Sequence, residues 1–296
     1  MKTFAATVLG RRALTPHLVS ITLGGLEGWQ STGIPDEYVR LLLPPRPDAP
    51  LVLPEIGEDF SYSYPEGAEP LVPRVYTISD HRVVDGDVRV DIDIAVHEQG
   101  VGSDWARVCQ PGDQVGVIEP HGLYRPPAGS TSQLLVCDLT GVPALARILR
   151  DLAPGVHAEV HVVVTDTSDE VPLPSAADVS ATWQVVRNDH DIPPALEAAV
   201  TQRELPTDPA GHYVWLAGEA RASRAVRKHL RKGLGWSQAS FYTCGYWQID
   251  AEKWNARYEQ VAEKVQAEAM EAYQRAGADE GAYLDELDRI YESVGL

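Results

Sequence analysis

Cysteine is scarce in this chain of 296 residues, and long apolar runs are absent. Cys109, Cys137 and Cys244 are odd in number and far apart in sequence, which excludes a disulfide framework and a four-thiolate zinc or iron–sulfur site. No apolar stretch is long enough to cross a bilayer, and the one at the N-terminus is too short for a secretory signal. We therefore expect a cytoplasmic protein that does not bind a membrane.

Basic residues are also few. The chain has 25 lysines and arginines against 43 aspartates and glutamates, which gives a net charge of -18. Such a surface repels the phosphates of nucleic acids and anionic lipids, so we expect neither as a partner. The composition, 44% hydrophobic and 23% charged, is that of a folded globular protein, and the length predicts two domains of ordinary size.

The first of these domains is predicted over residues 1–128. Short segments of alternating apolar and polar residues, separated by glycine and proline, predict a closed antiparallel barrel of the Greek-key type. One short helix at residues 103–108 interrupts the strands and ends before Pro111-Gly112. The segments are His17–Leu23, Tyr38–Leu43, Arg74–Ile78, Val88–Val96 and Gln114–Ile118.

The second domain is predicted over residues 133–250, after a linker that contains proline and glycine. Here apolar strands alternate with helical segments, which predicts a parallel sheet with helices on both faces and a nucleotide-binding α/β fold. The expected strands are Leu134–Asp138, Ala158–Thr165, Trp183–Arg187, Tyr213–Ala217 and Ser240–Thr243. The expected helices lie at Pro143–Leu152 and near residues 192–203 and 219–232.

Residues 251–296 form a third segment with apolar residues at spacings of three and four, which predicts a helical hairpin. The segment holds eleven acidic and five basic residues. We expect the hairpin to dock on the body of the protein, with Trp254 and Tyr258 packed on the α/β domain.

Two segments of the predicted barrel carry residue types that bind phosphate and flat rings. Arg74 can bind a pyrophosphate through two nitrogens, and Tyr76 shares its strand face and can lie against a planar ring. Gly100-Val101-Gly102 leads into Ser103, the predicted N-cap of the short helix, whose free backbone N–H groups can hold a phosphate. Taken alone, the Arg74 segment is better explained as an ordinary strand with a surface arginine, and the glycine segment is also explained by a capped helix in a turn.

Three further segments lie where predicted parallel strands end. Asp138-Leu139-Thr140-Gly141 precedes a helix that begins with proline, an arrangement that can cradle phosphate or ribose. Gly218 allows a ligand to approach the backbone closely, and Tyr246 and Trp247 can cover a flat cofactor or an apolar substrate. A tight strand-to-helix turn and buried core aromatics explain these residues almost as well.

In this order, the segments resemble the siderophore-interacting protein family, flavoproteins of the ferredoxin-reductase superfamily that reduce ferric siderophores. The resemblance covers about residues 1–250; each motif is loose, and their order and spacing are specific. The matching residues are Arg74, Tyr76, Thr77, Asp91-Ile92-Asp93, His97, Ser103, Trp105, Ala106, Pro111-Gly112-Asp113, Asp138, Thr140, Pro143, Ala144, Ala217-Gly218-Glu219 and Gly245-Tyr246-Trp247.

The resemblance implies an FAD site, with NAD(P)H as the electron donor. Gly102 and Ser103 are expected to hold the FAD pyrophosphate, and Asp138 and Thr140 to lie near its other side. The remaining expected cofactor-binding residues are Arg74, Tyr76, Thr77, Ser79, Asp93, His97, Gly218, Glu219, Tyr246 and Trp247. The chain departs from the family at Ser79, Val101, Leu139 and Gln248, where the family usually has arginine, proline, an acid and arginine.

The implied activity is reduction of a ferric siderophore in the cytoplasm, with release of iron(II). The flavin supplies the redox chemistry, so no catalytic acid, base, nucleophile or protein-bound metal is expected. The acidic chain and the absence of arginine after Gly-Tyr-Trp favour neutral or cationic complexes such as hydroxamates. We expect Arg125 and Lys253 to line the siderophore pocket. A reductase of another acceptor and a non-catalytic siderophore carrier are the alternatives.

A cluster of basic residues occupies the helical segment 219–232. Its members are Arg221, Arg224, Arg227, Lys228, Arg231 and Lys232, with no acid between the first and the last. A solvated helix face is favoured here over a substrate or 2′-phosphate site. Asp166, which follows the second α/β strand, is a slight indication against a 2′-phosphate, so the choice between NADH and NADPH stays open.

Overall fold

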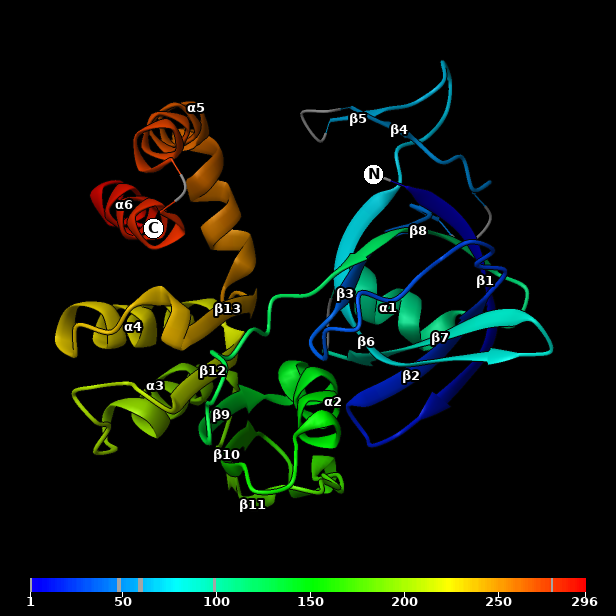
Figure 1. The fold of residues 1–296 in the computed structure, drawn as a ribbon. Coiled ribbons are helices and arrows are strands. Elements are labelled where there is room, and N and C mark those ends of the chain that lie inside the picture. The colour runs from blue at the N-terminus through cyan, green and yellow to red at the C-terminus, as the bar shows by residue number, and fades with distance from the viewer. Residues whose placement is uncertain (1, 47–48, 58–60, 98–99, 278) are drawn as a thin grey trace.

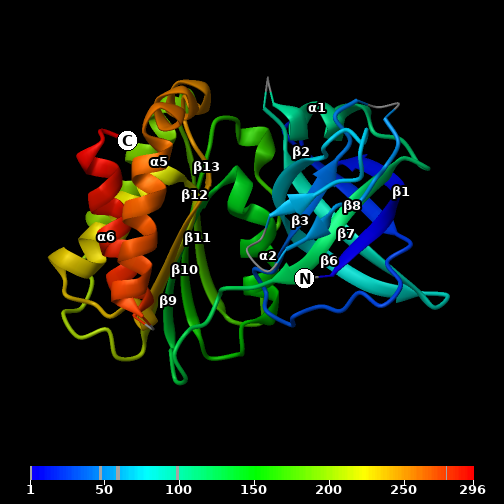
Figure 2. The same cartoon turned by 90° about the horizontal axis from the view of Figure 1, so that it is seen from above.

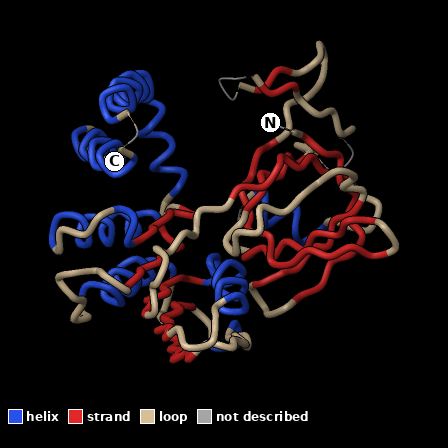
Figure 3. The backbone as a smooth tube through the Cα atoms, in the orientation of Figure 1, coloured by secondary structure: helices blue, strands red, loops and turns tan. Residues whose placement is uncertain are grey.

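The computed structural model describes residues 2–46, 49–57, 61–97, 100–277 and 279–296. It confirms the predicted fold class: an antiparallel barrel, a parallel sheet flanked by helices, and a C-terminal helix pair (Figure 1). The chain passes once from the barrel into the sheet and then into the helix pair (Figure 3). Among the described residues, no helix is both long and apolar enough to span a bilayer.

Six strands close the barrel in the order β1-β2-β7-β6-β3-β8. Inward-facing aliphatic residues fill it; Ile21 and Ile92, for example, are paired across β2 and β7 and are almost fully buried. The helix α1 (Val101–Val108) follows β7, and a small hairpin of β4 (Glu55–Ile56) and β5 (Tyr62–Ser63) lies outside the barrel. The barrel strands are β1 (Thr3–Ala13), β2 (Leu18–Gly24), β3 (Tyr38–Leu43), β6 (Val72–Val84), β7 (Asp87–Ala95) and β8 (Gln114–His121).

Strand β1 was missing from the predicted strands, although it pairs with both β2 and β8 and so closes the barrel. Its buried positions are the small residues Ala6 and Val8, and its register against β2 shifts between Val8 and Gly10. A strand with small inward residues and a break in its alternation gives a weak period-two signal.

The second part of the chain forms a parallel sheet in the order β11-β10-β9-β12-β13. Helix α2 covers one face and meets β6 of the barrel, whereas α3 and α4 cover the other face (Figure 2). The strands are β9 (Ser132–Asp138), β10 (His157–Val164), β11 (Asp178–Val185), β12 (His212–Glu219) and β13 (Phe241–Trp247). The helices are α2 (Val142–Asp151), α3 (Ile192–Thr201) and α4 (Ala220–Lys228), which continues as a π-helical turn over His229–Gly233.

Two of the predicted strands were misplaced. Strand β11 begins at Asp178 rather than at Trp183, because its first half is a polar, exposed edge that shows no buried pattern. Strand β13 extends to Trp247, four residues beyond the predicted end, and so brings Tyr246 and Trp247 into the sheet itself.

The C-terminal helix pair, α5 (Ala251–Ala276) and α6 (Glu280–Ser293), packs mainly on itself. Trp254 stacks on Tyr258, with ring centroids 5.2 Å apart, and lies 6.1 Å from the ring of Tyr291 in α6. The expectation that Trp254 and Tyr258 pack on the α/β domain is therefore wrong, because the apolar stripes of the two helices face each other.

Charged side chains join this helix pair to α4. Arg227 is nearly buried and donates to Asp285 and Asp288 of α6 at 2.9 and 2.8 Å. Arg231 pairs with Asp285 at 3.1 Å. The interpretation of the basic helix as a solvated face is thus corrected: part of it is the surface on which α6 docks.

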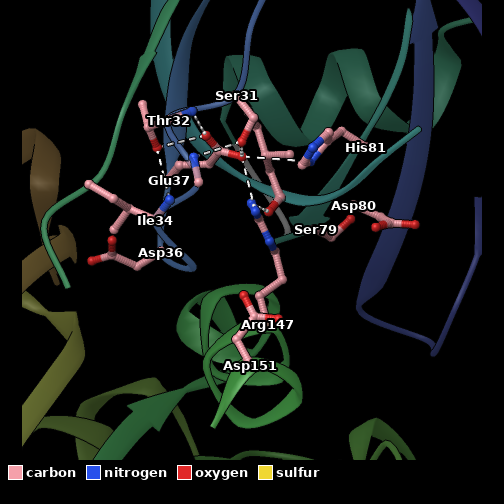
Figure 4. Close-up of polar contacts among 12 residues, drawn as sticks. Ser31, Thr32, Ile34, Asp36, Glu37, Ser79, Asp80, His81, Arg147 and Asp151 are labelled. Carbon is pink, nitrogen blue, oxygen red and sulfur yellow. Dashed lines mark hydrogen bonds and ion pairs between the residues drawn. The ribbon is translucent and has the colours of Figure 1, made fainter. Parts of the chain in front are cut away.

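Buried polar contacts fix the barrel against the sheet. Arg147 of α2 reaches the carboxylate of Glu37 at 3.0 Å and the carbonyl oxygen of Ile78 at 2.9 Å (Figure 4). On another part of the interface, the buried carboxylate of Asp169 accepts hydrogen bonds from Thr15 at 2.5 Å and contacts the His17 ring at 2.7 Å. These contacts set the position of the carboxyl edge of the sheet relative to the barrel.

Candidate functional site

A cavity of about 770 Å³ lies between the barrel and the carboxyl ends of the parallel strands. This volume is in the range of pockets that enclose whole cofactors. Of the residues predicted to bind the cofactor, ten line the cavity: Arg74, Tyr76, Thr77, Asp93, His97, Gly102, Ser103, Thr140, Tyr246 and Trp247. Segments far apart in the sequence thus meet at one place.

Strand β6 forms part of the barrel wall of the cavity. Arg74 and Tyr76 share a face of the strand, as predicted from their spacing. Arg74 is exposed, and its guanidinium donates to the carbonyl oxygen of Pro73 at 2.8 Å, which leaves further N–H groups for a ligand. Burial raises the pKa of Tyr76 to about 12, so its hydroxyl stays protonated and can donate a hydrogen bond.

Helix α1 presents its N-terminus to the same cavity. Its first backbone N–H groups, those of Val101, Gly102 and Ser103, have no intrahelical acceptor, and such groups bind anions. Ser103 is not the N-cap that was predicted. The N-cap is Gly100, at a φ of 135°, and the Ser103 hydroxyl instead accepts a hydrogen bond from the backbone N–H of His97 at 3.0 Å.

Gly102 is required by the packing of α1 against the barrel wall. A Cβ at this position would lie 1.6 Å from the Tyr76 hydroxyl oxygen, far inside contact distance. Because Gly102 has no Cβ, the ring of Tyr76 and the start of α1 can occupy adjacent positions in the cavity wall.

The sheet wall ends in Trp247. Its indole N–H donates to Oδ2 of Asp138 at 2.7 Å, and its ring lies 5.7 Å from the ring of His97 at an angle of 33°. Oδ1 of Asp138 accepts from the backbone N–H and the hydroxyl of Thr140 at 2.9 and 2.6 Å. Burial raises the pKa of Asp138, and these hydrogen bonds oppose that effect in part.

Four of the predicted cofactor residues do not line the described cavity. Ser79 donates to the carbonyl oxygen of Asp91 at 3.2 Å. Asp138 and Glu219 are buried behind the cavity wall, where Glu219 caps α4 by accepting from the backbone N–H of Arg221 at 2.7 Å. Gly218 packs on Asp138, since a Cβ there would lie 2.5 Å from Oδ2 of the carboxylate.

The two predicted substrate residues also fall outside the described lining. Arg125 is exposed on the linker, where its backbone N–H lies 3.4 Å from the hydroxyl of Tyr213. Lys253 is 83% exposed in the first turn of α5 and pairs with Asp250 at 3.2 Å. Arg125 and Lys253 lie close in sequence to residues that line the cavity. Closeness in sequence, however, did not show where their side chains point.

Sequence reasoning missed another part of the lining. Asp36 lies two residues before β3, Tyr38 and Arg40 come from the start of β3, and Tyr242 comes from β13. Asp36 accepts from the backbone N–H groups of Leu123 and Tyr124, both at 2.8 Å, and burial raises its pKa. No local motif marks these residues, because only barrel closure and the interface with the sheet bring them together.

Comparison with known proteins agrees with this geometry. Residues 7–124 match the family model described as a siderophore-interacting FAD-binding domain, and residues 130–250 match that of the siderophore-interacting protein. An NADPH-dependent ferric-chelate reductase of Escherichia coli is 32% identical over 231 residues, which are 76% of this chain and 85% of the relative. A ferric vibriobactin reductase of Vibrio cholerae is 28% identical over 245 residues, 80% of this chain and 86% of the relative.

A solved structure supports the same assignment. The structure of a siderophore utilization protein from T. fusca matches with a TM-score of 0.70 and 27% identity, over 84% of this chain and 93% of that chain. The chain therefore belongs to the siderophore-interacting protein family, with an N-terminal FAD-binding domain.

Proposed function

We propose that this chain is an FAD-dependent reductase that transfers electrons from NADPH to a ferric siderophore and releases iron(II). The observation that carries the proposal is the cavity of about 770 Å³, which brings the anion-binding groups of the barrel to the carboxyl edge of a parallel sheet. Such edges are where α/β sheets bind nucleotides. The name of the Escherichia coli relative, an NADPH-dependent ferric-chelate reductase, supports the choice of donor and acceptor.

The residues around the cavity fit FAD. The Arg74 guanidinium and the free N–H groups at the start of α1 would hold the pyrophosphate, while Tyr76 and Trp247 would flank flat rings. The glycine at position 102 leaves room for the Tyr76 hydroxyl beside these N–H groups. When bound, the flavin accepts a hydride and passes its two electrons on one at a time.

The electron balance fixes the stoichiometry of the proposed reaction. One NADPH gives up a hydride, which carries two electrons, and each iron(III) takes one electron. Two ferric siderophores are therefore reduced for each NADPH oxidised, and one proton is released. Iron(II) has a lower charge than iron(III), so hard oxygen ligands hold it more weakly and the metal leaves the siderophore.

Neutral or cationic complexes, such as ferric hydroxamates, are the proposed substrates. The cavity lining includes three carboxylates and two arginine cations, which are those of Asp36, Asp93, Asp189, Arg40 and Arg74. Gln248, at the position where the family usually has arginine, is uncharged, and the chain as a whole carries a charge of -18. A highly anionic catecholate complex meets net repulsion in this setting.

The test is anaerobic mixing of the flavin-loaded protein with NADPH, then with a ferric trihydroxamate and a coloured iron(II) chelator. The proposal predicts bleaching of the flavin by NADPH and two iron(II) per NADPH. Bleaching without iron(II) indicates a reductase of another acceptor, and failure to bind FAD indicates a siderophore carrier.

We propose a cytoplasmic setting, in which the three free cysteines remain reduced.

A further inference from the structure

Two buried carboxylates hold the last residue of β13 and the two residues that follow it. Asp138, at the end of β9, accepts the indole N–H of Trp247. Glu219, at the end of β12, accepts the backbone N–H of Ile249 at 3.1 Å and the side-chain amide of Gln248 at 3.3 Å. The three successive residues 247–249 are thus fixed to the ends of two neighbouring strands.

Both carboxylate oxygens of Asp138 accept hydrogen bonds from described residues of the protein. Its side chain is 1% exposed and is not part of the described cavity lining. Thr140 supplies both donors to Oδ1, and the Trp247 indole supplies the donor to Oδ2. Gly218 closes the space beside Oδ2. A direct contact between Asp138 and a cofactor would require displacing the groups that pack around this buried carboxylate.

Trp247, in contrast, does line the cavity. Its nitrogen is anchored by Asp138, and its ring lies against the ring of His97, whose backbone is held in turn by Ser103 and Arg107. This hydrogen bond and this ring contact hold the indole at the cavity, together with the packing of Trp247 on the apolar core beneath α3 and α4. A hydrogen bond to a buried carboxylate constrains the indole strongly, because a buried N–H group left without an acceptor is costly.

We propose that Asp138 is a positioning residue, which orients the Trp247 indole as a wall of the FAD site and acts on the cofactor only through that ring. The inference rests on the proposed function, because it takes the cavity to be the FAD site. It changes the role predicted for Asp138 from a contact of the cofactor to a support of the residue that makes the contact.

A double-mutant cycle tests this role, with FAD affinity and flavin fluorescence as readouts. In Asp138→Asn, the amide oxygen turns to the two donors of Thr140, and the NH₂ group then faces the indole N–H, which loses its acceptor. We expect FAD to bind about tenfold more weakly and the flavin fluorescence of the bound state to rise, because the indole no longer lies in its quenching position.

The decisive comparison repeats Asp138→Asn in the W247F background, where the indole N–H is absent. There we expect the substitution to change neither FAD affinity nor fluorescence. An equal loss of affinity in both backgrounds overturns the inference, because Asp138 would then act on the cofactor without Trp247. No loss in either background overturns it as well. Tm measured on the FAD-free proteins shows that each variant is folded.

A second measurement uses the unsubstituted protein and stands even if Asp138→Asn fails to fold. The indole ¹⁵N–H resonance of Trp247, identified by its loss in W247F, is expected to exchange slowly with solvent, with or without FAD. Rapid exchange overturns the inference. If Asp138→Asn weakens FAD binding only when Trp247 is present, but the protein releases no iron(II), the proposed function fails and the role of Asp138 stands. The two proposals therefore fail separately.

Discussion

The guanidinium of Arg147 and the carboxylate of Glu37 form an ion pair of 3.0 Å between the sheet and the barrel, and both side chains are almost fully buried. Ser31 and Thr32 donate to the same carboxylate at 2.7 to 2.8 Å. The proposed reaction requires the nicotinamide held by one domain to meet the flavin held by the other. The Arg147–Glu37 ion pair fixes the position of one domain relative to the other, and hydride transfer depends on that position.

Replacement of Arg147 by alanine is expected to lower the free energy of unfolding by about 3–5 kcal/mol, since it leaves the buried charge of Glu37 without its partner. Arg150→Ala is the matched control on the same helix. Its guanidinium pairs with Asp80 at 3.4 Å with both side chains exposed, so about 0–1 kcal/mol is expected. Urea unfolding measures both, and equal losses would contradict the assignment.

The same pair predicts a dependence of stability on pH. Burial raises the pKa of Glu37, but hydrogen bonds from Ser31 and Thr32 and the charge of Arg147 outweigh it and hold the pKa below the ordinary value of 4.5. As the pH falls, protons bind the unfolded state first, so the stabilisation is present above 4.5 and is lost as the pH falls through the lowered pKa.

Comparison with Glu37→Gln isolates this contribution from those of the other acids. The difference in unfolding free energy between the unsubstituted protein and the variant is expected to shrink steadily between about pH 6 and pH 3. A difference that stays constant or grows on acidification would show that the carboxylate is not stabilised in its charged form.

Gly102→Ala tests the packing at the start of α1. The new methyl group would overlap the Tyr76 hydroxyl and push the ring toward the cavity, so we expect FAD affinity to fall about tenfold or more while the barrel stays folded. Gly10→Ala is the control, because a Cβ at Gly10 meets nothing within 4 Å. Fluorescence titration with FAD measures both, and an unchanged affinity of Gly102→Ala would refute the proposed position of the cofactor.

Arg227→Ala is expected to loosen the C-terminal helix pair. The substitution removes the hydrogen bonds to Asp285 and Asp288 and costs about 2 kcal/mol of docking free energy. Hydrogen exchange over residues 280–293 is expected to accelerate. Lys228→Ala, which removes the exposed pair with Glu292, serves as the control and is expected to leave exchange nearly unchanged. Equal protection in both variants would mean that other contacts hold α6.

The sequence was most informative where local pattern and chemistry agree. The spacing of Arg74 and Tyr76 correctly placed them on one face of a strand, and the strand ends at Thr140 and Trp247 correctly pointed to the cavity. These are properties of single elements, which period-two alternation and strand-to-helix turns reveal directly.

What the sequence did not reveal depends on tertiary contacts. Asp36 and Arg40 line the cavity only because the barrel closes beside the sheet, and Arg227 is buried only because α6 docks on it. Residues as far apart as Asp138 and Trp247 form a hydrogen bond only when β9 and β13 end at the same edge of the sheet. Local periodicity carries no information about such pairings.

Electron transfer from NADPH to ferric siderophores is the activity proposed for the cavity between the barrel and the sheet. Its most direct test is the anaerobic titration of iron(II) against NADPH with the flavin-loaded protein and a ferric trihydroxamate. Two iron(II) are expected for each NADPH oxidised. A protein whose flavin is reduced by NADPH but yields no iron(II) above the protein-free control would contradict it.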